Sequence, residues 1–229
     1  MSAYTRLRSL LASADATAEV RAWVHGYLTD VATGVVEVVA VRHPLGFTCF
    51  PVWRQEDSGI CLHVWSTDRR AATTTSMVHA HSWNLVSHVL YGTVVNEIID
   101  VSADSDAGTH LVFEVRSDID GDTVRATHRS VRYRSRSREV FRDGDVYTLP
   151  HSEFHVTDVL STAATLVLGE HIPGELDLSL GDPGTTDHRV ERTPHSSQRT
   201  RELAEAVLAR LRTDCPTNGL EERCDTANS

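Results

Sequence analysis

The sequence of 229 residues contains no lysine, so all 22 of its basic residues are arginines. A chain without lysine cannot form a Schiff base, anchor pyridoxal or build the lysine-containing loop that binds nucleotide phosphates. Acidic residues number 32, and the formal net charge is −10 at pH 7. Nucleic acids and anionic membranes require a basic face, so this charge argues against both and favours small molecules as partners.

Long apolar runs and closely paired cysteines are also lacking. No stretch approaches the roughly 20 apolar residues of a membrane span, and the N-terminal residues show no secretory leader. The four cysteines, Cys49, Cys61, Cys215 and Cys224, contain no CxxC pair. This excludes a zinc finger and a disulfide scaffold. We therefore expect a cytoplasmic protein with free thiols and no contact with membranes.

Two periodicities divide the chain. Apolar residues recur every three to four residues over 4–11, 16–28 and 199–211, which predicts two N-terminal helices and one amphipathic C-terminal helix. The residues between them form short Val-, Ile- and Thr-rich runs separated by Gly, Pro and Asp, which predict a β-sandwich or barrel. The expected strands cover 35–41, 47–53, 59–65, 85–91, 94–101, 111–115, 123–141, 146–149 and 165–168.

These patterns predict an all-β domain with helical extensions at both ends. An N-terminal helical extension covers 1–33 and the β domain covers 34–173. A connector rich in Gly, Pro and Asp, followed by the C-terminal helix, covers 174–213, and a disordered tail covers 214–229.

The thirteen histidines include one closely spaced pair, His79 and His81. Residues two apart in a strand point to the same face, about 6–7 Å apart along the chain, so both imidazoles can reach one cation. Gly92 lies eleven residues after His81. Further along the chain, residues 144–155 contain the pattern G-x5-P-x4-H, which ends at His155.

This joint spacing resembles the two signature motifs of the cupin superfamily, in which a small β-barrel holds a metal ion through histidines of both motifs. The resemblance covers roughly residues 35–170 and implies a cupin β-barrel, also called a double-stranded β-helix or jelly roll. It implies that His79, His81 and His155 are the metal ligands. Leu85 stands where many cupins have a glutamate, so the site is similar to those of three-histidine cupin oxygenases, especially the thiol dioxygenases.

Three imidazoles without a carboxylate leave the full charge of a divalent cation uncompensated, and they suit Fe, Ni, Cu or Zn rather than Mg or Ca. Coordination positions stay open for substrate and dioxygen, as catalytic metal sites require. We therefore expect Fe(II), with Ni(II) or another divalent transition metal as the alternative. A 2-oxoglutarate requirement is disfavoured, because such sites generally combine two histidines with a carboxylate.

Strand alternation predicts which side chains surround this site. In the strand over 59–65, either Cys61, His63 and Trp65 or their apolar neighbours point inward, and the polar and aromatic set is unusual enough to favour a pocket. In the strand over 85–91, the same alternation turns Tyr91 inward and His88 away. We therefore expect catalytic roles for His63 and Tyr91.

Recognition of the substrate is expected from Trp65 together with Arg54 and Glu170 at the rim of the pocket. The late strand of this chain lacks the Ser-x-His-x-Tyr run of the thiol dioxygenases, and no arginine stands near Thr48, where their carboxylate-binding arginine would fall. These departures favour a modified or larger amino-acid-like substrate over free cysteine.

The sequence therefore predicts a metal-dependent oxidoreductase, a non-haem dioxygenase whose partners are a small amino-acid-derived molecule and O2. Two other classes remain open, namely a non-redox isomerase, lyase or hydrolase with a Lewis-acid metal, and a ligand-binding cupin without turnover. A homodimer is also expected. The first helical segments carry an apolar face with Val20, Trp23, Val24 and Tyr27, which exceeds what one small barrel needs to cover.

Overall fold

The computed structural model describes residues 1–13, 16–66, 73–103, 108–118 and 121–213. Its helices are α1 (Ala3–Leu11), α2 (Ala16–Thr33) and α3 (Ser197–Thr213). Its strands are β1 (Val41–Arg42), β2 (Phe47–Gln55), β3 (Ser58–Trp65), β4 (His79–Ala80), β5 (Trp83–Tyr91), β6 (Thr93–Ala103), β7 (His110–Asp118), β8 (Gly121–Arg142), β9 (Val146–Leu149), β10 (His155–Val159), β11 (Ala163–His171), β12 (Asp177–Gly181), β13 (His188–Val190) and β14 (Thr193–Pro194).

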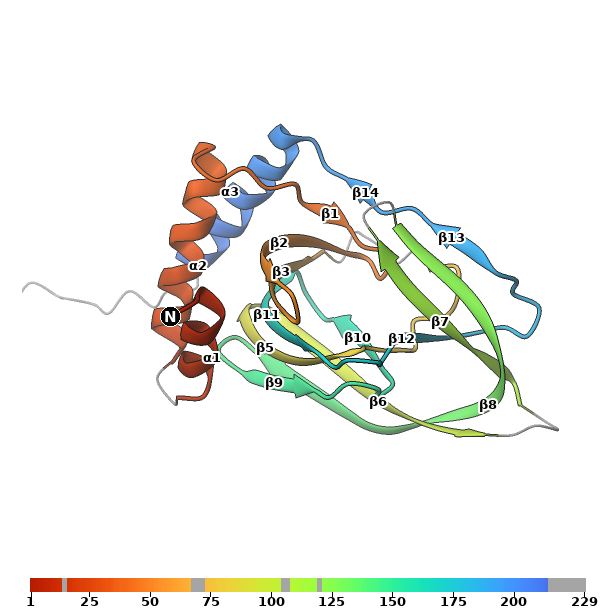
Figure 1. The fold of residues 1–229 in the computed structure, drawn as a ribbon. Helices are drawn as coiled ribbons and strands as arrows, with labels where there is room; N and C mark the ends of the chain where they lie inside the picture. The colour runs from red at the N-terminus through yellow and green to blue at the C-terminus, as the bar shows by residue number, and fades with distance from the viewer. Residues whose placement is uncertain (14–15, 67–72, 104–107, 119–120, 214–229) are drawn as a thin grey trace, which may run out of the picture.

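Within the described residues, the strands form two seven-stranded antiparallel sheets (Figure 1). The first sheet has the order β14-β1-β2-β3-β11-β5-β9, and the second has the order β13-β8-β6-β10-β4-β12-β7. Strands that are distant in the sequence pair side by side, as β3 and β11 do, which is typical of jelly rolls. The predicted all-β fold, with two packed antiparallel sheets and helices before and after them, is confirmed.

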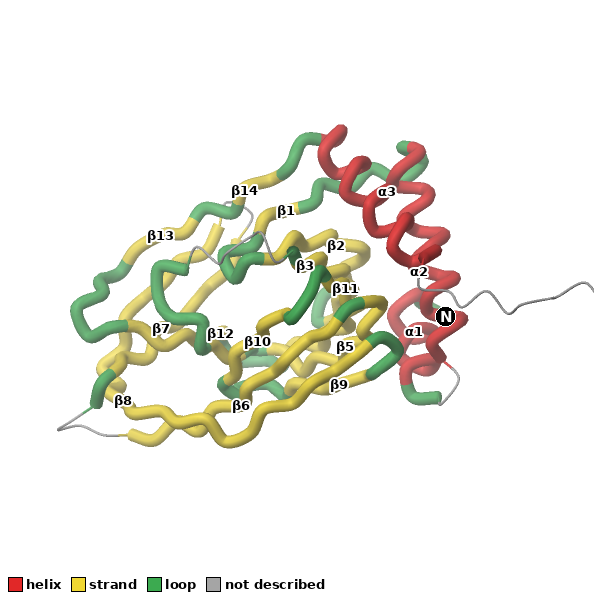
Figure 2. The backbone as a smooth tube through the Cα atoms, turned by 180° about the vertical axis from the view of Figure 1, so that it is seen from behind, coloured by secondary structure: helices red, strands yellow, loops and turns green. Residues whose placement is uncertain are grey.

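The helices pack together over the outer face of the first sheet (Figure 2). On α2, Val20, Val24 and Leu28 recur at helical spacing and are fully buried. Each large apolar side chain buried in this way contributes about 1.5–3 kcal/mol. We call this region the helix layer. The side chains that the first sheet contributes to it are Phe50, Ile60, Leu62, Leu90, Tyr91, Ala164, Leu166 and Leu168.

The helix layer removes the argument for a homodimer. Val20 and Val24 are buried within the chain, so the apolar face that favoured dimerisation is already covered inside the helix layer. Trp23 and Tyr27 are half-buried and stack on each other, with ring centroids 6.0 Å apart. The homodimer stays a prediction that this helix face no longer supports.

The expected strand over 35–41 is mostly absent from the described structure. Only its last residue belongs to β1, and Val35 and Val39 are 75% and 45% exposed. The backbone N–H of Val36 donates to the carbonyl oxygen of Asp30, 3.0 Å away at the end of α2. The backbone of this segment therefore bonds to the last turn of α2 at Val36 and does not pair with a strand before Val41.

The segment after residue 173 differs from the expected connector. Strand β12 pairs with both β4 and β7 in the second sheet, β13 pairs with β8, and β14 pairs with β1 in the first sheet. Residues 174–195 therefore form part of the barrel wall. The expected tail over 214–229, with Cys215 and Cys224, lies outside the described residues.

A search of the described helices for a membrane span gives a negative result. None of them is both long enough and apolar enough to cross a bilayer.

Candidate metal centre and substrate cavity

A cavity of about 260 Å³ lies between the two sheets. On β3, Cys61, His63 and Trp65 line this cavity, whereas Ile60 and Leu62 point the opposite way into the helix layer. The strand register that we expected for β3 is therefore confirmed. One face of the first sheet packs against helices, and the other presents polar and aromatic side chains to the cavity.

The three predicted metal ligands meet on the wall formed by the second sheet. His155 on β10 is the direct cross-strand partner of His79 on β4, and His81 follows two residues later. The ring centroids lie 4.3 Å apart for His79 and His155, 4.8 Å for His79 and His81, and 5.1 Å for His81 and His155. One ligand nitrogen from each ring lies within 4.8 Å of the other two. The three histidines that the motif spacing singled out therefore form one group of three converging nitrogen atoms.

Backbone carbonyl groups orient two of these rings. The Nδ1 atom of His79 lies 2.9 Å from the carbonyl oxygen of Met77, and that of His155 lies 3.0 Å from the carbonyl oxygen of Glu153. Because a carbonyl oxygen only accepts, each Nδ1 donates and carries the proton of the neutral ring. The Nε2 lone pair is thereby left for a metal ion, as in most histidine metal sites.

Burial keeps the three rings neutral. Loss of hydration first and the neighbouring His79 ring second together lower the pKa of His155 to about 3. The pKa of His81 is lowered well below its usual value by burial first and by His79 and His155 next. Neutral imidazoles are the form that binds a cation, so the donor set fits a divalent transition metal at this place.

The surroundings of the three histidines agree with a site built on neutral ligands. Leu85, which occupies the position of the glutamate in many cupins, lines the cavity as an apolar side chain. The carboxylate of Asp177 also faces the cavity, and its Oδ1 accepts hydrogen bonds from the Ser82 amide at 2.7 Å and the Ser82 hydroxyl at 2.9 Å. Asp177 thereby holds the chain directly after His81, which is a positioning role that the sequence pattern did not indicate.

His63 and Trp65 lie in the cavity, as predicted. The ring of Phe47 stacks on His63 at 4.2 Å between centroids and packs against Trp65 at 4.6 Å. Among the described residues, the buried Nε1 of Trp65 has no hydrogen-bond partner. An indole N–H without a partner next to a cavity is available to a bound molecule.

Arg54 also lines the cavity, as predicted for a substrate-binding residue. Its guanidinium carbon lies 4.8 Å from the centre of the Trp83 ring, which also lines the cavity. Stacking on an aromatic ring uses the face of the guanidinium, so its N–H edges can still donate to a carboxylate. Trp53 lines the cavity as well, which gives the cavity an aromatic wall around one arginine.

The expectation that Tyr91 faces the cavity is wrong. Tyr91 is buried in the helix layer instead. The pairing of β5 with β11 explains the difference, because Ala164 lies opposite Tyr91 while the next residue, Thr165, lies opposite Val89. Leu90 is therefore an extra residue in a β-bulge, and the alternation after Val89 shifts by one position.

The expectation for Glu170 is also wrong. Its neighbour Gly169 lines the cavity, so strand alternation turns Glu170 to the outside. The Glu170 carboxylate accepts a hydrogen bond from Arg8 of α1 at 2.7 Å, and the two side chains are 45% and 54% exposed. Glu170 therefore joins a helix to the sheet and does not contact the cavity.

Tyr147 on β9 is the tyrosine that does line the cavity. Burial raises its pKa to about 12, although hydrogen bonding with Ser87 and Asn96 acts in the opposite direction. Its phenol therefore keeps its proton at neutral pH and can donate it in a hydrogen bond. Alternation over 146–149 places Tyr147 and Leu149 on one face, and this signal was present in the sequence.

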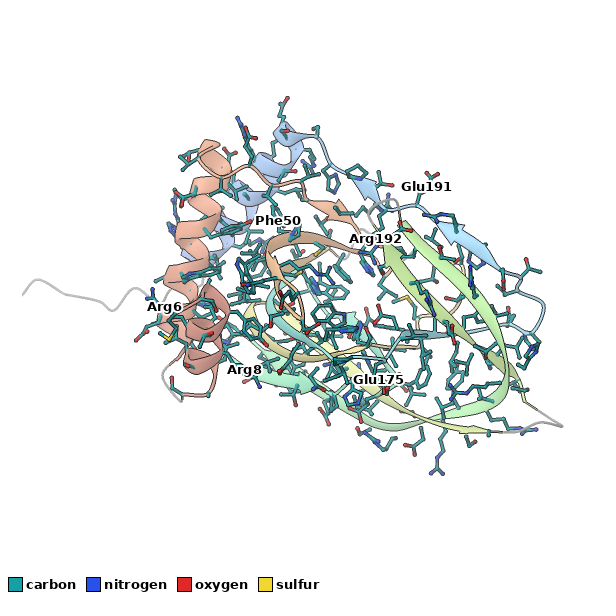
Figure 3. The ribbon with its side chains drawn as sticks, in the orientation of Figure 1. Arg6, Arg8, Phe50, Glu175, Glu191 and Arg192 are labelled. Atoms are coloured by element: carbon teal, nitrogen blue, oxygen red, sulfur yellow. The ribbon has the colours of Figure 1, made fainter. Side chains whose placement is uncertain are left out.

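Arg192 reaches the cavity from the segment that the sequence assigned to a connector. Figure 3 shows its side chain directed toward the barrel, whereas that of Glu191 points away. The guanidinium of Arg192 forms an ion pair with the buried carboxylate of Asp122, with Nη2 2.8 Å from Oδ1. It donates hydrogen bonds to Asp122 Oδ2 at 3.1 Å and to the hydroxyl of Ser117 at 2.8 Å. Only the pairing of distant strands brings Arg192 here, so sequence reasoning missed it.

Comparison with known proteins gives only distant similarities. No family model and no curated protein matches the chain. Among solved structures, a cupin-2 domain protein from Shewanella frigidimarina is 10% identical and a hydroquinone 1,2-dioxygenase from Sphingomonas is 14% identical, both with TM-scores of 0.30. The matches cover 54% of this chain and 79% of the first protein, and 53% of this chain and 64% of the second. TM-scores this low assign no substrate or reaction.

Proposed function

We propose that this chain is a metal-dependent oxidoreductase, a non-haem dioxygenase acting on a small amino-acid-derived substrate, sulfur-containing ones included. The observation that carries the proposal is the set of three neutral imidazoles, His79, His81 and His155, directed at one point on the wall of an aromatic cavity. A donor set without a carboxylate suits Fe(II) first and Ni(II) or another divalent transition metal second. When bound, such an ion supplies Lewis acidity and, in the case of iron, electron transfer with dioxygen.

The cavity side chains can bind and orient an amino-acid-like substrate. Arg54 is held over the ring of Trp83 and can donate paired hydrogen bonds to a substrate carboxylate. Trp65 offers its unpartnered indole N–H, and its ring excludes water together with Phe47. Arg54 thus binds the charged end of the substrate while the apolar wall surrounds the rest.

Two further cavity residues can hold or move a proton. The ring of His63 can accept a proton from a substrate group and return it. The phenol of Tyr147 stays protonated because burial raises its pKa to about 12, so it acts as a hydrogen-bond donor to an oxygen atom of the substrate. We assign to Tyr147 the role that the sequence pattern gave to Tyr91.

The same side chains also support a non-redox isomerase or lyase. His63 and Tyr147 both line the cavity, and such enzymes need a Lewis-acid metal with a residue that moves a proton. We rank this function second, because the motif spacing around the three histidines resembles that of three-histidine cupin oxygenases. We further propose that the protein is cytoplasmic and binds no nucleic acid and no membrane. The homodimer stays a prediction that no described surface supports.

Oxygen uptake tests the proposed function directly. The metal-free protein is loaded with Fe(II) or Ni(II) without oxygen and then mixed with amino acids and thiol-bearing amino-acid derivatives in an oxygen electrode. We expect uptake with at least one substrate and its loss in His155→Ala. His88→Leu is the matched control, because His88 is buried outside the cavity lining and should leave uptake intact. Substrate turnover without oxygen uptake would refute the dioxygenase and favour the isomerase or lyase.

A further inference from the structure

A second group of metal-binding side chains lies on the opposite wall of the cavity, on the first sheet. It consists of Cys49 on β2 with Cys61 and His63 on β3, and we call it the cysteine–histidine cluster. One ligand atom from each residue, either sulfur or ring nitrogen, lies within 4.8 Å of the other two. All three side chains are half-buried and line the cavity. The cluster shares no ligand with the three-histidine site.

Strand register holds the cluster together. Cys49 is the direct cross-strand partner of His63, and Cys61 lies two residues before His63 on the same face of β3. The three side chains therefore project from two paired strands rather than from a loop. Positions of this kind are set by the backbone of the sheet, so the ligand atoms are close together before any ion binds.

The same register disfavours a disulfide bond between the two cysteines. Cys61 pairs with Pro51, so Cys49 and Cys61 are diagonal neighbours. Cα atoms of diagonal neighbours are about 7–8 Å apart, whereas a disulfide needs Cα atoms no more than about 7 Å apart. A metal ion tolerates the diagonal arrangement. With metal–ligand bonds of about 2.0–2.3 Å, the ligand atoms of a tetrahedral site need to approach one another by only about 1 Å.

The chemistry of the cluster suits a soft cation. A hydrogen bond from the Cys49 thiol lowers the pKa of Cys61, and a hydrogen bond with His63 lowers it further, although burial acts in the opposite direction. Arg54 also favours the thiolate of Cys61 through its charge. A thiolate beside a second thiol and an imidazole is a strong donor set for thiophilic ions and a poor one for Mg or Ca.

We propose that Cys49, Cys61 and His63 form a second metal site that binds one thiophilic divalent cation of the zinc type. Two sulfur ligands and one nitrogen leave a fourth position on the cavity side, and three protein ligands with one open position are typical of catalytic zinc. An ion at this site occupies a ring nitrogen of His63. Zinc binding therefore prevents His63 from taking part in proton transfer. The activity of the three-histidine site on the opposite wall of the cavity should then depend on the zinc concentration.

Cadmium titration tests the second site, because a thiolate bound to Cd(II) gives a charge-transfer absorption in the ultraviolet and histidine ligands do not. The full chain is used with Cys215→Ser and Cys224→Ser, so that only the cluster contributes sulfur. It is reduced with a non-thiol reductant and stripped of metal. We expect two Cd(II) ions per chain, with one accounting for the thiolate absorption.

Variants separate the two sites. Cys61→Ser in the same background should lose the thiolate absorption and one bound ion, whereas His155→Ala should lose one ion and keep the absorption. Zn(II) should protect Cys49 and Cys61 from alkylation, read by mass spectrometry, which also confirms that both thiols are reduced. Far-ultraviolet circular dichroism verifies that each variant is folded, and Cys49→Ser replaces Cys61→Ser if the latter is not.

The proposal is overturned by the absence of thiolate absorption in the reduced protein, or by undiminished thiolate absorption in the folded Cys61→Ser or Cys49→Ser protein. Failure of oxygen uptake leaves this test unaffected, because the readout is metal binding at the cluster and not turnover.

Discussion

The two faces of the first sheet differ although the same strands build both. On β3, Ile60 and Leu62 pack in the helix layer, while Cys61 and His63 line the cavity. The helix layer consists of close-packed apolar side chains, and the cavity wall carries thiols, imidazoles, indoles and a guanidinium. Because of strand alternation, side chains on one face stabilise the fold, and side chains on the other face are available to bind a metal ion or substrate. Substitutions on the two faces should therefore affect different measurements.

Phe50→Ala should give the largest effect. Phe50 is fully buried in the helix layer (Figure 3), and its removal leaves a cavity that costs about 3–5 kcal/mol of unfolding free energy. Chemical denaturation measures this loss. Metal affinity of the molecules that remain folded should stay the same, and a large loss of affinity at full folding would show that the two faces are not separable.

His155→Ala should give the opposite result. Loss of a ligand should lower the affinity for a divalent transition metal by about 100-fold or more, since loss of a residue that merely supports a ligand costs about 10–100-fold. Calorimetric titration measures the affinity. The metal-free variant should unfold at nearly the same denaturant concentration as the parent, and an equally large loss of stability would mean that His155 serves packing rather than metal binding.

Acid should destabilise the metal-free protein through the buried imidazoles. Burial lowers the pKa of His81, His88 and His155 below their unfolded values. The unfolded chain therefore binds protons more tightly than the folded one, and stability falls as the pH falls below about 6.5. For His155 the loss continues down to its folded pKa of about 3. Denaturation at a series of pH values checks this, and a stability that is flat between pH 7 and pH 4 would contradict it.

Two tyrosine-to-phenylalanine substitutions, one in the cavity and one in the helix layer, each remove a single hydroxyl group and compare its effect on turnover. Tyr147→Phe removes a phenol from the cavity and should lower turnover about 10-fold, the value of one hydrogen bond of about 1–1.5 kcal/mol. Tyr91→Phe removes a phenol from the helix layer and should leave turnover unchanged. Turnover is measured for both variants at equal metal content, and a larger loss in Tyr91→Phe would reverse our assignment.

Arg8→Ala should give the smallest effect. Its ion pair with Glu170 is about half exposed, and pairs of this kind contribute less than about 1 kcal/mol. Metal affinity and turnover should not change, because neither residue lines the cavity. A marked change in the KM for substrate would return Glu170 to the binding site that the sequence pattern suggested.

Local periodicity predicted most of the elements that form the barrel, and motif spacing predicted the three histidines. Alternation placed Cys61, His63 and Trp65 correctly because β3 keeps a regular pleat. It failed for Tyr91 because a bulge at Leu90 depends on the partner strand, which the local sequence does not show. Glu170 lies outside the cavity because it follows Gly169, whose position on β11 faces inward.

Pairings across long sequence distances were beyond local reasoning. Strand β12 is short and lies between turn residues, so its own pattern does not predict a strand. It becomes a strand because it pairs antiparallel with β4 on one side and with β7 on the other, and both of these are distant in the sequence. Asp177 and Arg192, which come from this region, are therefore visible at the cavity only in the folded chain.

The place of β4 in the second sheet has a consequence for the order of assembly at the ribosome. The two residues of β4 are held between β10 and β12, and Asp177 fastens the chain after His81. A nascent chain that ends before β12 contains all three histidine ligands but lacks the strand that fixes their backbone. Contacts of such high sequence separation form late in folding. Metal loading should therefore follow the emergence of β12 from the ribosome rather than that of the histidines alone.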